Sequence, residues 1–422
     1  MKVLTDFIQN LLDFLVKQQY EHSQNIIRTH TKKLNELGDL SFPTNANNWY
    51  QFIDVNNEES IKPLNIFKFG SSETTREFVI EQLLQESSSW PIQIKKIVFK
   101  NADAHIHLKR TPVLYKSVIK TVLMQDSQYG SCPIMSNNFN VLVSVNIEDR
   151  DIVNLTTLRM MILKQIAESF IKYNTIESPR STYNLQFVAN LVDNENINLL
   201  CGPVLNERGI KSNLTAKELY EKRASDMRMM AQHKYGVQIK PNKAWETYFN
   251  NIGKGSVTIE MLTNKPQKSI KITPNDLQSA NKGASFIFYN CARLSALFKE
   301  FEKRVMSEEY PRLPDIDEVN FHLIDQPEEW ELFYVYILQF PMVIKSCVKD
   351  IEKGIFNPQY LISFLSNLCS VFSVYYRRVR ILTNPREHMF SIIHSRIYLL
   401  KALQCVFHNS LHLLNIEPIK EM

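Results

Sequence analysis

The sequence predicts a mixed α+β or α/β fold in its N-terminal and middle regions and an all-α helical bundle at its C-terminus. Up to about residue 272, short β-branched or alternating apolar runs are interspersed with helical periodicity. Beyond that point the apolar residues recur only at helical spacing. The 422 residues, 44% hydrophobic and 22% charged, have the composition of a globular protein of two or three domains.

The first zone, residues 1–136, is predicted to be an α/β domain. Its N-terminal apolar residues follow a helical spacing, and two later runs have the length and alternation of strands. In chain order, the predicted elements are a helix within Met1–Leu37, a helix over Ser72–Ser88, strands over Ile94–Phe99 and Ala104–Leu108, and a helix over Pro112–Met124.

The second zone, residues 137–272, is predicted to be a β-α-β-β unit, small for a nucleotide-binding core, followed by two helices. The first strand is indicated by a β-branched run, and Gly202-Pro203 interrupts the last one. The predicted strands are Phe139–Val145, Leu185–Leu191 and Asn198–Leu205, and the predicted helices are Leu155–Tyr173, Thr215–Tyr235 and Trp245–Asn250.

The third zone, residues 273–422, is predicted to be helical throughout. Apolar residues alternate at intervals of three and four over Ala284–Met306, Trp330–Val348 and Pro358–Ile381. For the last helix, Asn384 is the expected N-cap, with Pro385 at the first helical position and Glu387 completing the cap.

Composition also bears on the environment of the chain. The six cysteines form no C-x-x-C pair and most lie in apolar periodic segments, which is typical of buried side chains in a reducing compartment. No apolar run approaches the roughly 18 residues that cross a bilayer. Charged residues interrupt the N-terminal apolar segment and argue against a signal peptide. A cytoplasmic protein without a membrane partner is therefore expected.

Positive charge is concentrated at the C-terminal end. From Phe340 to Met422 there are ten Lys and Arg against five Asp and Glu, which equals the net charge of +5 of the entire chain. A positive end on a neutral body suggests an anionic partner there, although an ordinary solvated helical surface is the alternative.

The motifs of catalytic and cofactor sites are missing from the sequence. It contains no G-x-x-x-x-G-K-[ST], no G-x-G-x-x-G and no G-x-S-x-G, and only ten glycines. His105 and His107 alternate near Asp103 and could imitate a metal site, but no third ligand is marked, so a partly exposed strand face is the preferred interpretation. We therefore expect no catalytic residue, no metal and no cofactor.

A basic and aromatic constellation near the C-terminus is the best candidate for a binding site. Arginine forks onto phosphates or stacks on unpaired bases, and tyrosine offers a stacking platform. The alternative is that some of these aromatics are core, because Tyr375 and Val379 lie on the apolar stripe of their helix. The candidate RNA-binding residues are Tyr376, Arg377, Arg378, Arg380, Arg386, His388, Arg396 and Lys401.

Particular segments resemble arginyl-tRNA synthetases. The stretch GASFIFYNCARLSALF, Gly283–Phe298, resembles the helix that joins their catalytic core to the anticodon-binding domain, with Tyr289, Ala292 and Arg293 at the pattern positions. The last eighty residues resemble their DALR anticodon-binding domain. Ala104–Val122 is similar to the close of their N-terminal tRNA-elbow-binding domain.

The departures from this family concern its catalytic motifs. The synthetases carry a His-x-Gly-His signature that holds the ATP phosphates, whereas the aligned Asn154–Thr157 has neither histidine nor glycine; Leu158-Arg159 does resemble the Leu-Arg that follows. No Lys-Met-Ser-Lys-Ser loop precedes Gly283, and the nearest segment, Lys222–Met227, is predicted to be plain helix. The middle zone is thus expected to be a reduced, inactive synthetase-like core.

This combination resembles the DALR anticodon-binding domain-containing protein 3 family, non-catalytic relatives of arginyl-tRNA synthetase. The resemblance implies an adaptor that recognises arginine tRNAs and presents them to a 3-methylcytidine tRNA methyltransferase acting on the anticodon loop. Two alternatives remain open: a residual synthetase-like enzyme, and a structural subunit of a larger complex without RNA binding.

Overall fold

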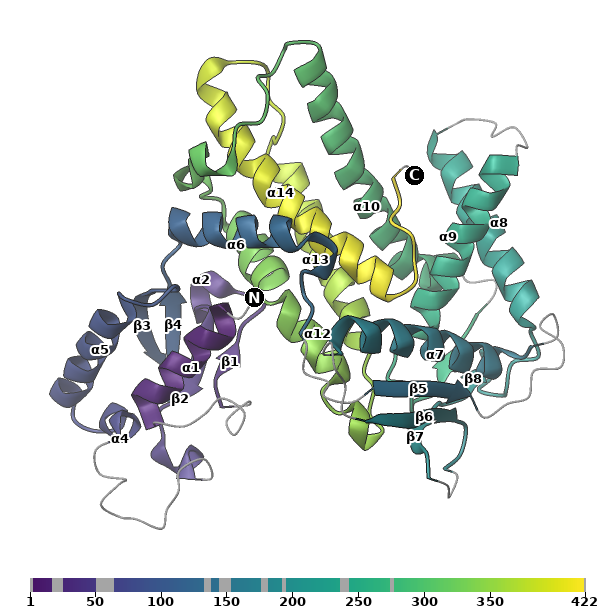
Figure 1. Ribbon diagram of the computed structural model, residues 1–422, viewed down its shortest axis with the longest axis horizontal. Helices are drawn as coiled ribbons and strands as arrows, with labels where there is room; N and C mark the ends of the chain where they lie inside the picture. The colour runs from purple at the N-terminus through teal and green to yellow at the C-terminus, as the bar shows by residue number, and fades with distance from the viewer. Residues whose placement is uncertain are drawn as a thin grey trace. The chain divides into compact units, whose positions relative to one another are not determined.

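The chain folds into two compact units, each built from segments that lie far apart in the sequence. The computed structural model describes residues 3–16, 26–50, 64–132, 138–143, 153–175, 181–191, 195–235, 243–273 and 277–420 (Figure 1). Unit 1 comprises Met1–Thr121, Pro314–Gln339 and His394–Leu399, and unit 2 comprises Val122–Leu313, Phe340–Ile393 and Leu400–Met422. The zones predicted from the sequence are consecutive, whereas these units are not.

Unit 1 is organised around an antiparallel sheet of order β1-β2-β4-β3. Its strands are β1 (Arg28–Thr29), β2 (Leu40–Pro43), β3 (Ile94–Lys100) and β4 (Asp103–Leu108), and its helices include α1 (Val3–Val16), α2 (Leu34–Leu37), α4 (Asn65–Phe69) and α5 (Glu73–Ser87). The predicted β3, β4 and α5 are confirmed, and the Ser72 hydroxyl caps α5. The sequence-based prediction missed β1 and β2, because a two- and a four-residue strand are too short for a clear alternation.

Two segments from the C-terminal half, Pro314–Gln339 and His394–Leu399, complete unit 1. The helix α11 (Pro327–Glu331) runs into a π-helix, Leu332–Leu338, whose residues are all buried. Trp330 Nε1 donates to the Asp39 carboxylate at 2.7 Å, and the Tyr334 hydroxyl donates to the Asp39 carbonyl at 2.7 Å. The predicted helix Trp330–Val348 is therefore α11, the π-helix and α12 (Phe340–Val348) in succession.

Unit 2 begins with a parallel sheet of order β5-β6-β7. The strands are β5 (Asn138–Val143), β6 (Thr182–Val188) and β7 (Ile197–Leu200), and α7 (Leu155–Asn174) connects the first two. The predicted β-α-β-β order is confirmed, except that Asn198–Leu205 divides into β7 and β8 (Val204–Leu205). Residues 144 and 145 of the predicted first strand lie outside the described residues. The division falls at Gly202, whose backbone approaches Lys268 so closely that a Cβ atom would lie 2.5 Å from the Lys268 carbonyl carbon.

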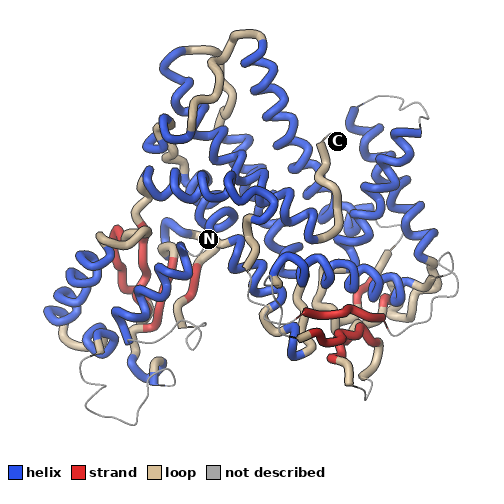
Figure 2. The backbone as a smooth tube through the Cα atoms, viewed as in Figure 1, coloured by secondary structure: helices blue, strands red, loops and turns tan. Residues whose placement is uncertain are grey.

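The rest of unit 2 is mainly helical, as Figure 2 shows by its long blue segments. Helices α8 (Ala216–Tyr235) and α9 (Lys243–Met261) form a helical hairpin. Strand β9 (Ile270–Lys271) follows and pairs with β8. The C-terminal helices are α10 (Leu277–Met306), α12, α13 (Gln359–Arg378) and α14 (Glu387–Leu413), and α6 (Pro112–Gln125) leads into this unit from unit 1. The all-helical prediction for this part of the chain is confirmed.

The start of α14 differs from the prediction. The helix begins at Glu387 with Arg386 in extended conformation as its N-cap, so Asn384 is not the cap and Pro385 is not the first helical residue. The segment before α14 is instead held by tertiary hydrogen bonds to the Thr383 carbonyl, described below. The capping pattern in the sequence therefore placed the start of the helix two residues too early.

One long segment has the composition of a membrane span, which corrects the expectation that no apolar run comes close. By length and composition alone, the helical segment Pro327–Lys353 is long and apolar enough to cross a membrane. However, 72% of its most apolar window is buried inside the protein. Its side chains include Trp330 and Phe340, which are buried among other aromatic rings. These features are typical of a core helix.

Candidate nucleic-acid interface

Two tyrosines and one arginine form a stack between α10 and α13. The Arg293 guanidinium lies over the ring of Tyr289, 4.3 Å from its centroid, and over the ring of Tyr376, 4.7 Å from its centroid. The Tyr376 side chain is 39% exposed, so one part of its ring packs on arginine and another part faces solvent. A planar ring held in this way is a platform on which an unpaired base stacks.

The basic residues that follow Tyr376 are exposed. Arg377 and Arg378 end α13, Arg380 comes two residues later, and Arg386 and His388 flank the start of α14. All five side chains are exposed, in contrast to Tyr375 and Val379, which are buried as the core alternative expected. The core interpretation therefore holds for Tyr375 and Val379, whereas the five basic residues lie on the surface.

Hydrogen bonds fix the segment between α13 and α14. Arg304 donates to the Thr383 carbonyl at 3.1 Å and to the Tyr310 hydroxyl at 3.0 Å, and the Tyr310 hydroxyl also donates to the Thr383 carbonyl. The Glu300 carboxylate accepts from Arg304 Nε at 2.8 Å and raises the pKa of this guanidinium. Arg304 therefore positions the segment that carries Arg380 and Arg386.

A small hollow of about 290 Å³ opens beside the stack. Its walls include Leu297, Tyr376, Arg380 and the ion pair of Arg304 with Glu300, so apolar surface, an aromatic ring and the positive charge of Arg380 meet in one place. Unpaired bases of RNA loops are recognised by this combination of stacking and charge. The hollow, the Arg293 stack and the exposed arginines lie within unit 2, and together they are the candidate nucleic-acid interface.

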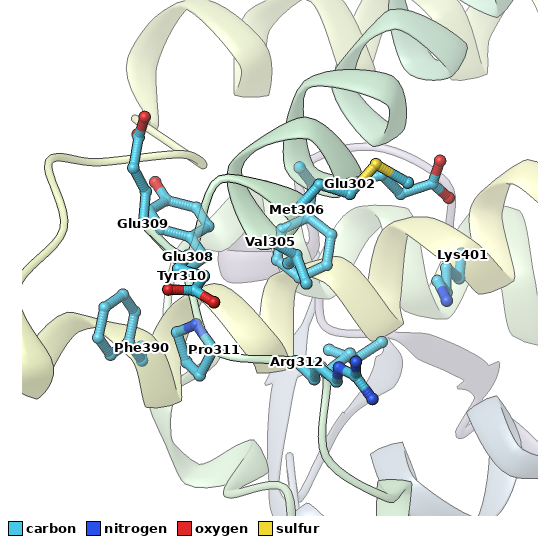
Figure 3. A pocket seen from close by; sticks show the side chains of 12 residues that line it. Glu302, Val305, Met306, Glu308, Glu309, Tyr310, Pro311, Arg312, Phe390 and Lys401 are labelled. Atoms are coloured by element: carbon cyan, nitrogen blue, oxygen red, sulfur yellow. The ribbon is translucent and has the colours of Figure 1, made fainter.

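Two predicted site residues lie elsewhere. Arg396 belongs to unit 1, where it is 7% exposed and its Nε donates to the Glu329 carboxylate at 2.7 Å. Because breaking a buried ion pair is costly, Arg396 is a structural residue and we exclude it from the interface. Lys401 is half-buried on α14 and lines a different, larger hollow (Figure 3).

Sequence reasoning named Tyr289 and Arg293 only as parts of a family pattern, not as site residues. Their spacing of four residues on one helix was the available signal, because such residues are neighbours on a helix surface. The partner of this pair, Tyr376, comes from a helix more than eighty positions later in the chain. Only the packing of α10 on α13 brings the three side chains together.

Asn154–Thr157, where the resemblance to the synthetases led us to expect the histidine signature, have structural contacts here. The Asn154 side chain caps α7 by accepting from the Thr157 amide at 3.0 Å, and the Thr156 hydroxyl accepts from the Val204 amide at 3.1 Å. Arg159 is buried and donates to carbonyls that include those of Met261 and Gly202. These side chains therefore brace α7 against β8 and the end of α9.

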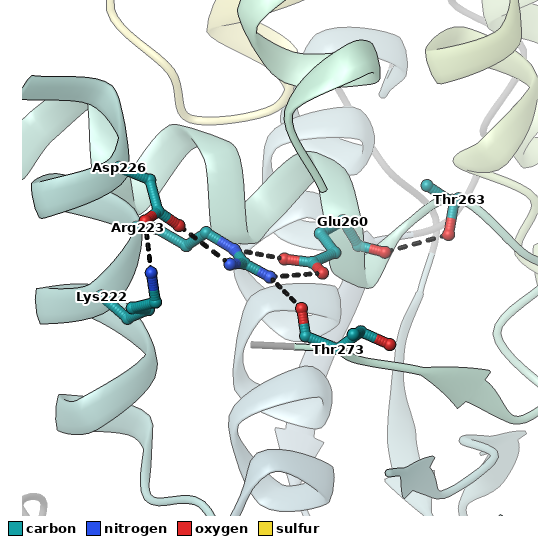
Figure 4. Close-up of polar contacts among 6 residues, drawn as sticks. All are labelled: Lys222, Arg223, Asp226, Glu260, Thr263 and Thr273. Atoms are coloured by element: carbon teal, nitrogen blue, oxygen red, sulfur yellow. Dashed lines mark hydrogen bonds and ion pairs between the residues drawn. The ribbon is translucent and has the colours of Figure 1, made fainter. Parts of the chain in front are cut away.

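The segment Lys222–Met227 forms part of α8, as predicted. Arg223 is fully buried and bonds to the carboxylates of Asp226 at 3.1 Å and Glu260 at 2.9 Å, and Lys222 bonds to the other carboxylate oxygen of Asp226 (Figure 4). The two carboxylates raise the pKa of Arg223 against the effect of burial. This network joins the two helices of the hairpin.

The two strand histidines belong to β4 in the sheet of unit 1. His105 Nδ1 lies 2.7 Å from the Leu37 carbonyl, and burial together with Lys96 lowers the pKa of His107. Across the described part of the chain, no group of three or more His, Cys, Asp or Glu side chains is suitably placed for a metal ion. The register pairs Lys96 with His107 and Lys100 with Asp103, so exposed lysines and these histidines share one face of the sheet.

The fold and the basic helical surface define the class of this chain: a protein with the arginyl-tRNA synthetase fold and a DALR anticodon-binding domain at its C-terminus. Residues 287–422 match the model of the DALR anticodon binding domain. Thermus thermophilus arginyl-tRNA synthetase shares the fold at a TM-score of 0.60 over 99% of each chain, with 11% sequence identity. Both the resemblance and the fold class expected from the sequence are confirmed.

The similar proteins include two named DALR anticodon-binding domain-containing protein 3. Those of Mus musculus and Rattus norvegicus are 30% and 29% identical over 229 and 242 residues, which are 53% and 56% of this chain. The matches cover 43% and 45% of those proteins, so the chain spans less than half the length of these relatives. An arginine–tRNA ligase of Borrelia hermsii is 27% identical over 41% of this chain and 27% of that protein.

Proposed function

We propose that the chain is a tRNA-binding adaptor that performs no chemistry itself. In this proposal it recognises arginine tRNAs and presents them to a 3-methylcytidine tRNA methyltransferase that modifies the anticodon loop, in the cytoplasm. The DALR domain and the synthetase fold support binding of tRNA. The observation that carries the proposal is the packing of Arg293 on the partly exposed ring of Tyr376, which lines one hollow with Arg380. Arg378 and Arg386, close by in the sequence, are exposed as well.

The sheet of unit 1 supports a second contact with tRNA. Strand β3 is an edge strand with exposed Lys95, Lys96 and Lys100, and Arg28 at the other edge is half exposed while it pairs with Asp103 at 2.6 Å. Lysines on an edge strand also prevent strand-to-strand aggregation, so their charge alone is not specific for RNA. The resemblance of Ala104–Val122 to the close of the synthetases' elbow-binding domain, expected from the sequence, would place a tRNA contact here.

A charge reversal at the candidate interface tests the tRNA-binding part. The triple variant Arg378→Glu, Arg380→Glu, Arg386→Glu should lose at least about 100-fold in affinity for arginine tRNA, because each lost phosphate contact removes counterion release. In the wild-type protein, the logarithm of the affinity should fall by roughly 0.7–0.9 units per phosphate contact for each tenfold rise in salt. Fluorescence anisotropy with labelled tRNA at several salt concentrations measures both quantities.

A matched control distinguishes the loss of specific contacts at the interface from the effect of a changed net charge. The variant Arg208→Glu, Lys211→Glu, Lys271→Glu changes three exposed basic residues of the same unit by the same total charge. It should retain tRNA affinity within about threefold, since long-range effects between exposed charges are screened at physiological salt. Equal losses in the two variants, or undiminished binding by the interface variant, would refute the proposed site.

The non-catalytic part of the proposal has its own test. In the synthetases the histidine signature stabilises ATP phosphates, and Asn154 and Thr156 at the aligned positions here bond to the protein backbone instead. We expect no arginine-dependent exchange of pyrophosphate into ATP by the purified chain, with or without tRNA. Exchange above background by the purified chain would establish the enzyme alternative.

A further inference from the structure

A second and larger hollow lies on unit 2, beside the end of α10. It has a volume of about 890 Å³ and is enclosed by α10, the segment 307–313 and α14 (Figure 3). Its apolar lining includes Phe301, Val305, Met306, Tyr310 and Phe390. Met306 is 83% exposed, more than any other large apolar side chain in the described residues. A flexible, exposed methionine beside an apolar hollow is typical of protein-binding surfaces.

The charges around this hollow differ from those of the candidate nucleic-acid interface. Glu302, Glu308 and Glu309 are exposed and line it, and Arg312 and Lys401 are the basic residues of the lining. Figure 3 shows the carboxylates of Glu302 and Glu309 on its upper side and Lys401 and Arg312 to the right and below. The three carboxylates outnumber the two basic groups, so the lining has a net negative charge that disfavours RNA phosphates and favours a protein segment with basic side chains on one flank.

The wall of the hollow is held in a defined conformation. Glu308 has a positive φ of 59°, an uncommon conformation for a residue with a side chain, and lies in the tight turn that follows α10. The Tyr310 amide then donates to the Arg304 carbonyl at 3.0 Å, and the Tyr310 ring packs against Phe301 and Phe390 with centroids 6.0 and 5.6 Å away. A preformed wall reduces the entropy lost when a partner docks.

Tyr310 also connects the hollow to the candidate nucleic-acid interface. Its ring lines the hollow, while its hydroxyl and Arg304 bond to the Thr383 carbonyl in the segment before α14. On α10, Glu300 and Arg304 line the smaller hollow of that interface, and Glu302 and Met306 line this one. A protein docked here would lie on the neighbouring face of the helix that supports the RNA contact.

We infer that this hollow is the docking site for the enzyme partner, a conclusion that rests on the proposed adaptor function. The occupant is an amphipathic segment of the methyltransferase. Its apolar side chains fill the space beside Met306 and Phe390, basic side chains face Glu302, Glu308 and Glu309, and an acidic side chain meets Lys401. The adjacent faces of α10 thus hold the tRNA and the enzyme at the same time.

The test measures two affinities on each variant of the full chain. The probes are arginine tRNA and the purified 3-methylcytidine tRNA methyltransferase of the same organism, bound separately. Met306→Glu, and the triple variant Glu302→Gln, Glu308→Gln, Glu309→Gln, should each weaken methyltransferase binding at least tenfold and change tRNA affinity by less than threefold. Met306→Leu should keep methyltransferase affinity within threefold, because it preserves an apolar side chain of similar size.

Matched controls use residues outside the hollow. Met124 is 77% exposed on α6, so Met124→Glu repeats the chemical change of Met306→Glu at another site of the same unit. Glu207→Gln, Glu221→Gln, Glu246→Gln neutralises three other exposed glutamates. Both controls should leave methyltransferase affinity unchanged.

The outcomes separate this inference from the function on which it rests. If the wild-type chain binds the methyltransferase and the hollow variants bind it equally well, the docking site is wrong and the adaptor function stands. A loss of tRNA affinity in the hollow variants would assign the hollow to RNA, and self-association that Met306→Glu abolishes in sedimentation would assign it to a second copy. A wild-type chain that binds tRNA but not the methyltransferase would overturn the adaptor function, and this inference with it.

Discussion

The arginines of the C-terminal helices divide into two groups according to what their guanidinium groups contact. Arg396 bonds to a buried carboxylate, Arg304 donates to a carbonyl and a hydroxyl, and Arg293 packs on two aromatic rings. Arg380 and Arg386 are exposed, and Arg380 lines the same hollow as Tyr376. Sequence alone does not separate these groups, because every arginine contributes the same charge to the total.

At the residue scale, Tyr376 is the most direct probe of base stacking. Tyr376→Ala should weaken tRNA binding by about 1–3 kcal/mol, roughly five- to 150-fold, because the platform for an unpaired base is lost. Tyr376→Phe keeps the ring and should bind within about threefold of wild type. Anisotropy titration measures both variants, and equal affinity of the Ala and Phe variants would exclude stacking on this residue.

Asp39 offers a residue-scale prediction in unit 1. Burial raises the pKa of its carboxyl above the ordinary value of 3.8, despite hydrogen bonds from the Leu108 amide and Trp330 that lower it. The folded state therefore binds this proton more tightly than the unfolded state does. The stabilising contribution is complete below about pH 4 and is lost as pH rises through the raised pKa.

The variant Asp39→Asn isolates this contribution, since it removes the ionisation and retains an acceptor. The difference in free energy of unfolding between the variant and the wild type should shift in favour of the variant as pH rises from about 4 to 7. Urea unfolding at intervals of half a pH unit measures this difference. A difference that is constant across this range would show that Asp39 has the same pKa in both states.

At the element scale, the hairpin of α8 and α9 depends on a close approach of two helices. A Cβ atom on Gly253 would lie 2.7 Å from the Ala224 amide nitrogen, closer than such atoms approach. The buried bonds of Arg223 to Asp226 and Glu260 cross the same pair of helices. The glycine thus allows the helix spacing at which this network forms.

Two Gly→Ala substitutions should therefore change the free energy of unfolding in opposite directions. Gly253→Ala should destabilise the protein by about 1–3 kcal/mol, because the added methyl overpacks the helix contact. Gly283→Ala, in α10, meets no atom within 4 Å and should stabilise it by about 0.5–1 kcal/mol through better helix propensity. Chemical unfolding followed by circular dichroism compares them, and a neutral Gly253→Ala would mean that the helices move apart at low cost.

At the scale of the whole molecule, unit 1 is not a contiguous N-terminal domain. Its core includes Trp330 and Tyr334, which bond to Asp39, and Tyr115, whose ring lies 4.4 Å from that of Phe333. The hydroxyl of Tyr398 donates to the Pro314 carbonyl at 2.7 Å within the same unit. Two separate parts of the chain therefore surround the Asp39 carboxylate, and a third part, which contains Tyr398, contributes to the same unit.

This arrangement predicts the behaviour of a fragment. Residues 1–136 alone should lack a cooperative unfolding transition, because removal of the segment 314–339 exposes apolar surface and leaves the buried Asp39 without its Trp330 and Tyr334 partners. Thermal unfolding and dispersion of amide signals in the NMR spectrum measure this. A sharp transition with dispersed signals would show that the N-terminal zone folds independently.

The sequence by itself determined the types of the long elements, the basic character of the C-terminal end and the resemblance to the synthetases. Hydrophobic periodicity is a local property, so α5, α7 and α13 were predictable within a few residues, whereas α10 begins at Leu277, well before the predicted Ala284. The missing histidine signature at Asn154–Thr157 is equally local, because a motif is a set of residue types at fixed spacing.

Only the tertiary structure decided which side chains serve the interface. In the structure, Arg293 packs on Tyr376, Arg396 is paired with Glu329 and therefore lies outside the interface, and Lys401 lines a second hollow. It also joined 314–339 to the N-terminal sheet. These outcomes depend on contacts between residues tens to hundreds of positions apart, and neither periodicity nor charge along the chain records which distant surfaces pack together.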